Sequence, residues 1–266
     1  MTASATSHID IAAPLLQVQG LSKSYGGVRA VRDISLAISS GTVFAVIGPN
    51  GAGKSTLLNL LSGLHQPDDG TIRFAGVELV GMPPHLRARH GLARTFQKIR
   101  LFKQLSVLEN VLVGYHTRHA IPPWQYLLHG AAFQQERRRC REQAIDLLEF
   151  VGLSHRASIA AGALSYGEQR LLEIARALAT APRLLMVDEP AAGLNTTEVA
   201  ALLLRITNLR ARGITVVMVE HNMNLVMTVA DRILVMDYGQ FLFEGTPSEV
   251  QCHPKVISAY LGADVP

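Results

Sequence analysis

The chain has 266 residues, enough for one large domain or two small ones with a substantial buried core. Hydrophobic residues make up 48% and charged residues 17%, as in ordinary soluble globular proteins. No uninterrupted apolar run approaches the roughly 20 residues that a membrane-spanning helix needs. The net charge of +4 would suit a place beside an anionic membrane but does not argue for a nucleic-acid partner. Cys140 and Cys252 lack metal-ligand spacing and predict free thiols in a reducing cytoplasm.

The first residues predict a short tail and then a strand pair. Residues 1–13 carry no Lys or Arg and no long apolar block, so we expect a disordered tail rather than a signal peptide. Leu15–Val18 and Val31–Ile38 read as strands separated by a turn at Gly26-Gly27. Tyr25 stands just before that turn. It either stacks on the base of a bound nucleotide or is a half-buried tyrosine of the sheet.

The next segment is a glycine-rich loop between a strand and a helix. Val43–Ile47 predicts a buried strand, and the apolar pattern of Leu57–Leu61 predicts a helix. Between them the spacing Gly-x4-Gly-Lys-Ser matches a phosphate-binding loop, whose backbone N–H groups and helix start face an anion. Lys54 is placed to reach the β- and γ-phosphates, and Ser55 to offer a hydroxyl to Mg²⁺. The sequence therefore predicts binding of a nucleoside triphosphate by Gly48, Pro49, Asn50, Gly51, Ala52, Gly53, Lys54, Ser55 and Thr56.

A hairpin and a further strand follow the P-loop helix. The turn-forming residues 66–70 lead to a hairpin of Thr71–Phe74 with Val77–Leu79, and Pro83-Pro84 opens a short helix. Ala93–Gln97 predicts another strand, with Gln97 at its end. Strand ends in α/β folds carry chemistry, so Gln97 either ligates Mg²⁺ through its carbonyl oxygen or is a surface glutamine.

From about residue 98 to residue 180 the pattern becomes mostly helical. Ser106 and Glu109 form a capping box before a helix that runs towards Tyr115. Residues 136–150 predict a second helix with one apolar face and a basic cluster on its polar side. That cluster, around Arg137, predicts either a solvated face or a contact with lipid headgroups.

The segment Leu164–Arg170 predicts a loop that feeds a helix over Leu171–Thr180. Ser165 and Glu168 have the spacing of a helix cap, which explains part of the segment. A cap does not explain Gly167, because glycine weakens a helix start. A helix start with Ser and Gly is also a second place where an anion can dock.

Two more apolar strands end in polar residues. Arg183–Val187 leads to Asp188 and Glu189, and two adjacent acids after such a strand would be costly to bury without a cation. In P-loop ATPases an Asp here holds Mg²⁺, and a second acid can orient the attacking water. The strand Ile214–Val219 leads to His221, which either hydrogen-bonds the γ-phosphate or is structural.

The remaining elements close the chain. Asn195 and Glu198 predict a helix cap. Met223–Ala230 predicts a helix, Arg232–Glu244 a hairpin, and Pro247–Tyr260 two short closing helices.

Taken together, these motifs resemble the ATP-binding-cassette family of transport ATPases, and the resemblance covers Leu15 to Gly262. It implies an α/β fold: a P-loop NTPase core with an antiparallel β subdomain and an α-helical signature subdomain. The cassette would span residues 14–262, with residues 98–180 as the helical insertion. Two positions depart from the commonest family pattern, because Tyr166 replaces a signature glycine and Asn195 stands where an Asp often occurs.

The resemblance also assigns roles to the candidate residues. ATP and Mg²⁺ are the implied ligands, with Glu189, His221 and Lys54 as the catalytic groups. Ser55, Gln97 and Asp188 are the implied metal ligands. The nucleotide would contact the P-loop, Tyr25 and Gln97, and the signature residues Ser165, Gly167 and Glu168 would complete the ATP site of a partner cassette.

At a finer level, residues 94–102, the signature segment, residues 189–195 and the insertion near Trp124 look like the ATPase subunits of branched-chain amino-acid importers. That resemblance implies membrane permease partners, a second identical or related cassette, an indirect link to a solute-binding protein, and a place on the cytoplasmic face of the inner membrane. Relatives that serve urea or amide uptake or lipopolysaccharide export remain alternatives. Two rivals are a soluble regulator acting on ribosomes or DNA, which usually carries two cassettes, and a small-molecule kinase, which would not use a second anion site.

Overall fold

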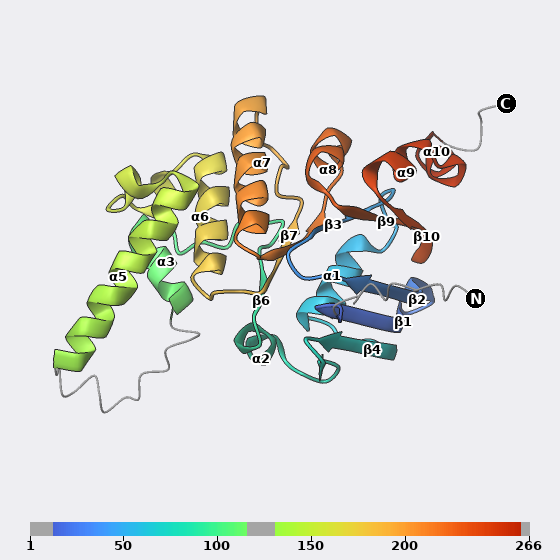
Figure 1. The fold of residues 1–266 in the computed structure, drawn as a ribbon, viewed down its shortest axis with the longest axis horizontal. Coiled ribbons are helices and arrows are strands. Elements are labelled where there is room, and N and C mark those ends of the chain that lie inside the picture. Colours follow the sequence, from blue (N-terminus) through green and yellow to red (C-terminus); the bar gives the residue numbers. More distant parts are fainter. Residues whose placement is uncertain (1–12, 116–130, 262–266) are drawn as a thin grey trace, which may run out of the picture.

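The computed structural model describes residues 13–115 and 131–261 and is built around a six-stranded sheet (Figure 1). Five of its strands are parallel, and only the edge strand β10 runs antiparallel to its neighbour. The spatial order is β10 (Gln240–Gly245), β9 (Arg232–Asp237), β3 (Val43–Ile47), β8 (Thr215–Val219), β7 (Leu184–Asp188) and β6 (Leu92–Arg94).

The central strands are apolar along their whole length because both faces of this sheet are covered. In β3, Phe44 and Val46 face one core, whereas Val43, Ala45 and Ile47 face the other. The neighbouring strands β7, β8 and β9 alternate between the same two cores. Their polar residues are therefore confined to the strand ends.

One of these cores lies between the large sheet and a second, antiparallel sheet. The second sheet has four strands in the order β2 (Val28–Ile38), β1 (Leu16–Tyr25), β4 (Asp69–Phe74) and β5 (Val77–Glu78). Helix α1 (Lys54–Ser62) contributes its leucines to the same core. Helix α2 (Pro84–Arg89) connects this region to β6.

The other helices cover the opposite face and one end of the molecule. Those that pack on the large sheet or close to it are α6 (Tyr166–Leu178), α7 (Thr196–Ala211), α8 (Met223–Val229), α9 (Pro247–Cys252) and α10 (Pro254–Leu261). At the left of Figure 1, α3 (Val107–Tyr115) and α5 (Ala131–Val151) share a third core with α6. None of the helices in the described part of the chain is long and apolar enough to span a membrane.

Most predicted elements are confirmed, and among the boundaries that differ, two bear on the candidate site. Helix α6 begins at Tyr166 rather than at Leu171, so the signature segment forms its first turn and not a loop before it. Strand β6 ends at Arg94, which leaves Gln97 in the loop that follows. Residues 1–12 of the predicted tail over 1–13, the insertion near Trp124 and the cassette's end at Gly262 lie outside the described residues. The division at residues 98 and 180 stays a prediction.

Candidate nucleotide site

The P-loop owes its shape to glycines that approach other backbone segments closely. A Cβ atom at Gly48 would lie 2.1 Å from the carbonyl oxygen of Met236, and one at Gly53 would lie 2.2 Å from that of Ala30. Both glycines also have positive φ angles, 150° and 93°. Any other residue would meet backbone at these positions, so the glycines are required by packing as well as by conformation.

Lys54 opens α1 and is held inside the curl of the loop. Its side chain is buried, and its ammonium donates to the carbonyl oxygens of Gly48 (2.7 Å) and Pro49 (2.8 Å). Burial lowers the pKa of Lys54, while the nearby carboxylates of Glu189 and Asp188 oppose that shift. The lysine is thus fixed in the loop within the electrostatic reach of both acids.

A cavity of about 310 Å³ is lined both by P-loop residues and by residues that follow strands β7 and β8. Glu189 and His221 line it together with residues 50–56, and Arg29, Arg32 and Tyr238 also belong to its lining. Tyr25 is not among the described residues that line this cavity. Its hydroxyl is hydrogen-bonded to Nδ1 of His65, and its ring lies edge-on to that imidazole.

Glu189 is held between Gln97 and His221, the two other polar residues that the sequence singled out. Its Oε2 accepts a hydrogen bond from the Gln97 amide (2.9 Å), and its Oε1 lies 2.8 Å from Nε2 of His221. The residue has a left-handed φ of 45°, and its N–H donates to the carbonyl oxygen of Val219. A non-glycine residue in this region is strained by about 1–2 kcal/mol, so the surrounding contacts hold it there.

Asp188 is buried beside Glu189 and is paired with Arg94, which sequence reasoning missed. The guanidinium of Arg94 donates to Asp188 Oδ2 (2.9 Å) and also to the side chains of Asn59 and Ser62 on α1. Burial lowers the pKa of Arg94, and its bond to Asp188 opposes the shift. Arg94 stands at a strand end, so the signal that pointed to Asp188 could have found it.

Glu220 is a second missed residue. Its carboxylate is buried and accepts hydrogen bonds from the backbone N–H groups of Ala191 (2.7 Å), His221 (3.0 Å) and Asn222 (3.2 Å). These contacts join the loops after β7 and β8. Glu220 therefore fixes the distance between the two loops that carry Glu189 and His221.

The signature residues form a separate helix start. Ser165 caps α6 by accepting from the Glu168 N–H, and the Glu168 carboxylate accepts from the Ser165 N–H. Gly167 is buried under the Glu198 side chain, where a Cβ would lie 2.3 Å from its Oε1. Ser165, Gly167 and Glu168 are not among the described residues that line the P-loop cavity, so the chain does not bring them to its own P-loop.

The residues present fit a triphosphate with Mg²⁺. The loop is a glycine cradle that a Cβ would fill, and it continues into the positive N-terminal end of α1. Ser55 and Glu189 line the same cavity, and Asp188 precedes Glu189 at the same strand end. Hydroxyl and carboxylate oxygens are the ligands that Mg²⁺ prefers.

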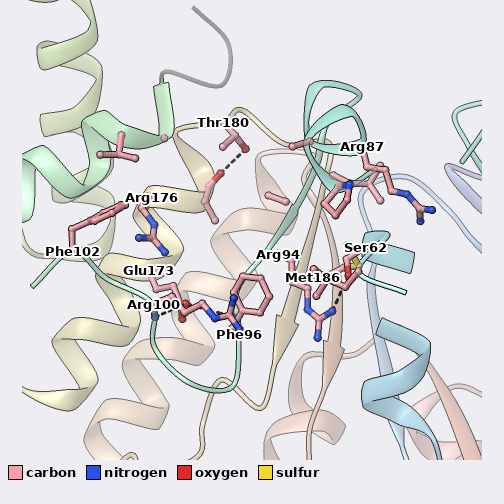
Figure 2. A pocket seen from close by; sticks show the side chains of 18 residues that line it. Ser62, Arg87, Arg94, Phe96, Arg100, Phe102, Glu173, Arg176, Thr180 and Met186 are labelled. Atoms are coloured by element: carbon pink, nitrogen blue, oxygen red, sulfur yellow. Dashed lines mark hydrogen bonds between the residues drawn. The ribbon is translucent and has the colours of Figure 1, made fainter. Parts of the chain in front are cut away.

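A larger cavity of about 450 Å³ lies between α2 and the helices α3 and α6 (Figure 2). Its lining includes apolar side chains such as Phe96 and Met186, together with Arg100, Arg176 and Glu173. Arg87 and Arg94 also line it, but their guanidinium groups are bonded to backbone carbonyls and to Asp188. Figure 2 shows the loop after β6 crossing this groove. The Gln97 loop therefore lies between the P-loop cavity and this groove.

Two family models match the chain. The model described as ABC transporter covers residues 31–192, and the one described as branched-chain amino acid ATP-binding cassette transporter covers residues 242–266. The chain is 45% identical to the high-affinity branched-chain amino acid transport ATP-binding protein BraF of Pseudomonas aeruginosa, and 44% identical to LivG of Salmonella typhimurium. Each alignment covers 94% of this chain and 98% of the relative.

Solved structures give the same result. A nucleotide-free ATP-binding cassette from an ABC transporter superposes with a TM-score of 0.81 at 33% identity and covers 94% of this chain and 99% of that one. A dimeric cassette in a post-hydrolysis state bound to ADP and Pi superposes with a TM-score of 0.74 at 25% identity, covering 87% and 98%. The chain therefore belongs to the ABC transporter family, as an ATP-binding-cassette ATPase.

Proposed function

We propose that this ATPase powers an importer of branched-chain amino acids. The observation that carries the ATPase part of the proposal is the placement of Glu189 between Gln97 and His221 above the P-loop. The solute is inferred from relatives that are named for branched-chain amino acid transport. The family model that matches residues 242–266 carries the same description and supports this solute over urea, amides or lipopolysaccharide.

The chemistry follows from the groups around the P-loop. Glu189 is the base: its carboxylate orients a water molecule and accepts its proton as the bond to the γ-phosphate breaks. Lys54 and the loop N–H groups stabilise the charge on the phosphates, and His221 holds Glu189 and the γ-phosphate in place. Ser55, Asp188 and Gln97 would hold Mg²⁺, which neutralises charge on the β- and γ-phosphates.

The reacting site would be completed by a second cassette, identical or related. Ser165 and Gly167 of that cassette would contact the γ-phosphate from the side opposite the P-loop, with Glu168 closing the turn. Tyr25 of this chain would contact the base of the ATP on its own P-loop. The separation of Ser165 and Gly167 from the P-loop cavity within one chain supports this arrangement, as does the dimeric relative bound to ADP and Pi. Hydrolysis would then separate the pair.

Permease subunits would dock at the groove between α2, α3 and α6. The groove borders the Gln97 loop, so a helix seated there would sense movements of Gln97, and the exposed Arg100 on its wall suits a segment that carries a carboxylate. The protein would then sit on the cytoplasmic face of the inner membrane, and a solute-binding protein would act through the permease.

Reconstitution tests the function. The protein would be co-purified from membranes with its permease subunits, placed in proteoliposomes with the matching binding protein, and supplied with ATP. We expect uptake of leucine, isoleucine and valine that depends on ATP. Uptake of urea or amides without these amino acids would overturn the solute assignment, and recovery without any membrane protein would favour a non-transport ATPase.

A further inference from the structure

The loop that carries Gln97 is fastened to the signature helix by one buried arginine. Arg170 lies on α6 and is 0% exposed. Its Nη1 donates to the carbonyl oxygen of Phe96 (2.6 Å), and its Nη2 donates to that of Gln97 (2.8 Å). A planar guanidinium can bridge two adjacent carbonyls in this way, whereas an ammonium cannot match both with the same geometry.

Glu173, one turn further along α6, completes the attachment. It is 2% exposed, and its Oε2 lies 3.1 Å from Arg170 Nη1. Its Oε1 accepts longer hydrogen bonds from the N–H groups of Phe96 (3.5 Å) and Arg100 (3.4 Å). Burial raises the pKa of Glu173, and the charge of Arg170 opposes that shift. The pair thus holds both carbonyls and amides of the loop, and Figure 2 shows the bond between Glu173 and Arg100.

The same guanidinium reaches the signature turn. Nη2 of Arg170 also donates to the hydroxyl of Tyr166 (3.3 Å), the residue that departs from the commonest signature pattern. The Tyr166 ring packs against Gly193, in the segment between Glu189 and α7. One nitrogen atom therefore connects the backbone of Gln97, whose side chain holds Glu189, with the first turn of α6.

We propose that Arg170 and Glu173 are positioning residues that lock the loop 96–100 to the first turn of α6. Gln97, which supports the base over this chain's own ATP, and the signature turn, which would serve the partner's ATP, then move together. The proposal rests on the ATPase activity and not on the identity of the solute.

Stability alone does not account for this pair. A buried ion pair gains little net stability, and well-packed apolar residues of similar volume often do as well or better. Here each charged group instead makes several directed bonds to a loop about 73 positions away in the sequence, from Arg170 to Gln97. Directed bonds of this kind fix a geometry, as a positioning role requires.

Arg170→Lys is the test variant, and Arg87→Lys is its matched control. Arg87 is also buried and donates to four backbone carbonyls, those of Leu60, Leu61, Leu79 and Met82, and none of these bonds goes to the Gln97 loop or to α6. Tyr166→Phe removes only the hydroxyl, and Glu173→Gln keeps the shape of the side chain. ATP turnover and amide hydrogen exchange would be measured on the full chain of each variant.

We expect Arg170→Lys to lower kcat about tenfold while KM for ATP stays within about twofold, because the P-loop is untouched. Tyr166→Phe should lower kcat by about twofold to threefold. Arg87→Lys should lower Tm comparably but leave kcat within about twofold. If kcat fell equally in Arg170→Lys and Arg87→Lys, Arg170 and Glu173 would have a purely structural role, and the proposal would be overturned.

Hydrogen exchange without ATP gives a second, independent measurement. Arg170→Lys and Glu173→Gln should speed exchange both in residues 96–100 and at the Glu168 amide, and Arg87→Lys should speed neither. Faster exchange in only one of the two segments would show that they are not coupled. If the wild-type chain itself does not turn over ATP, the ATPase assignment fails, and the exchange data still decide the coupling.

Discussion

Two helix starts in this molecule carry glycine and face predicted phosphate sites, yet they are built differently. Helix α1 follows Gly53, which has no side chain with which to cap the helix. Helix α6 follows Ser165, whose hydroxyl already accepts from the Glu168 N–H, while the Glu168 carboxylate closes the box from the other side. The first start leaves its N–H groups for a ligand, and the second satisfies part of its own.

The difference explains why the two sites need not be equally strong. At α1 the loop N–H groups, the helix dipole and Lys54 converge on one place, so the chain can bind phosphates by itself. At Ser165 a phosphate must compete with an internal hydrogen bond, and it gains fewer new contacts. The signature turn is therefore suited to complete a site that another chain's P-loop has already occupied.

The largest expected effect comes from removing the charge at the stronger start. Lys54→Ala should lower ATP turnover by about 10²-fold or more, because a preorganised cation no longer stabilises the phosphates. ATP binding should weaken in the same variant. Lys103→Ala, at an exposed lysine outside both sites, is the control, and equal turnover in the two variants would remove Lys54 from the site.

Substitutions at two P-loop glycines distinguish the cost of a backbone clash from the cost of a left-handed backbone conformation. Gly48→Ala would push a Cβ into the Met236 carbonyl and should destabilise the fold by about 2–3 kcal/mol. Gly51 also has a positive φ, but a Cβ there meets nothing within 4 Å, so Gly51→Ala should be destabilising by only about 1 kcal/mol. Thermal unfolding compares them. Equal losses would mean that close approach to Met236 does not matter.

Glu220→Gln tests the connection between the two strand-end loops. The neutral amide presents only one acceptor oxygen to the three N–H groups, so we expect a loss of about 1–3 kcal/mol in unfolding free energy. Turnover should fall as well, because Glu189 and His221 lose their fixed spacing. A variant of normal stability but low turnover would instead place Glu220 in the chemistry.

The smallest effects concern the helix caps. Ser165→Ala and Asn195→Ala each remove a capping-box side chain, and each should be destabilising by about 1 kcal/mol. Only Ser165→Ala should also reduce ATP-dependent pairing with a second cassette. Sedimentation of both variants with ATP distinguishes the two effects, and an identical shift in both would mean that Ser165 is no more than a cap.

The sequence predicted the elements of the core well because their signals are local. The strand β3 was predicted to the residue, since its apolar run and the glycine after it lie within ten positions. The strand-end rule also picked out Gln97, Glu189 and His221, and the structure brings these three together. Their roles in catalysis stay predictions.

What the sequence did not reveal depends on distant partners. Arg94 and Asp188, which form an ion pair, are 94 positions apart in the sequence. The hydrogen bonds from Arg170 to the Gln97 loop likewise leave no periodic pattern in the sequence from which they could be predicted. Gly167 seemed to argue against a helix start, but it lies inside α6 because Glu198 leaves no room for a side chain. Such contacts are set by tertiary packing, which overrides local propensity.

The central claim is that ATP held by the P-loop is cleaved with Glu189 as the base. Its most direct test is Glu189→Gln, with ATP binding and ATP turnover measured on the same sample. The variant keeps the size of the side chain but cannot accept the proton, so we predict that binding persists while turnover nearly vanishes. Turnover at the wild-type rate would contradict the account, because another group would then have to activate the water.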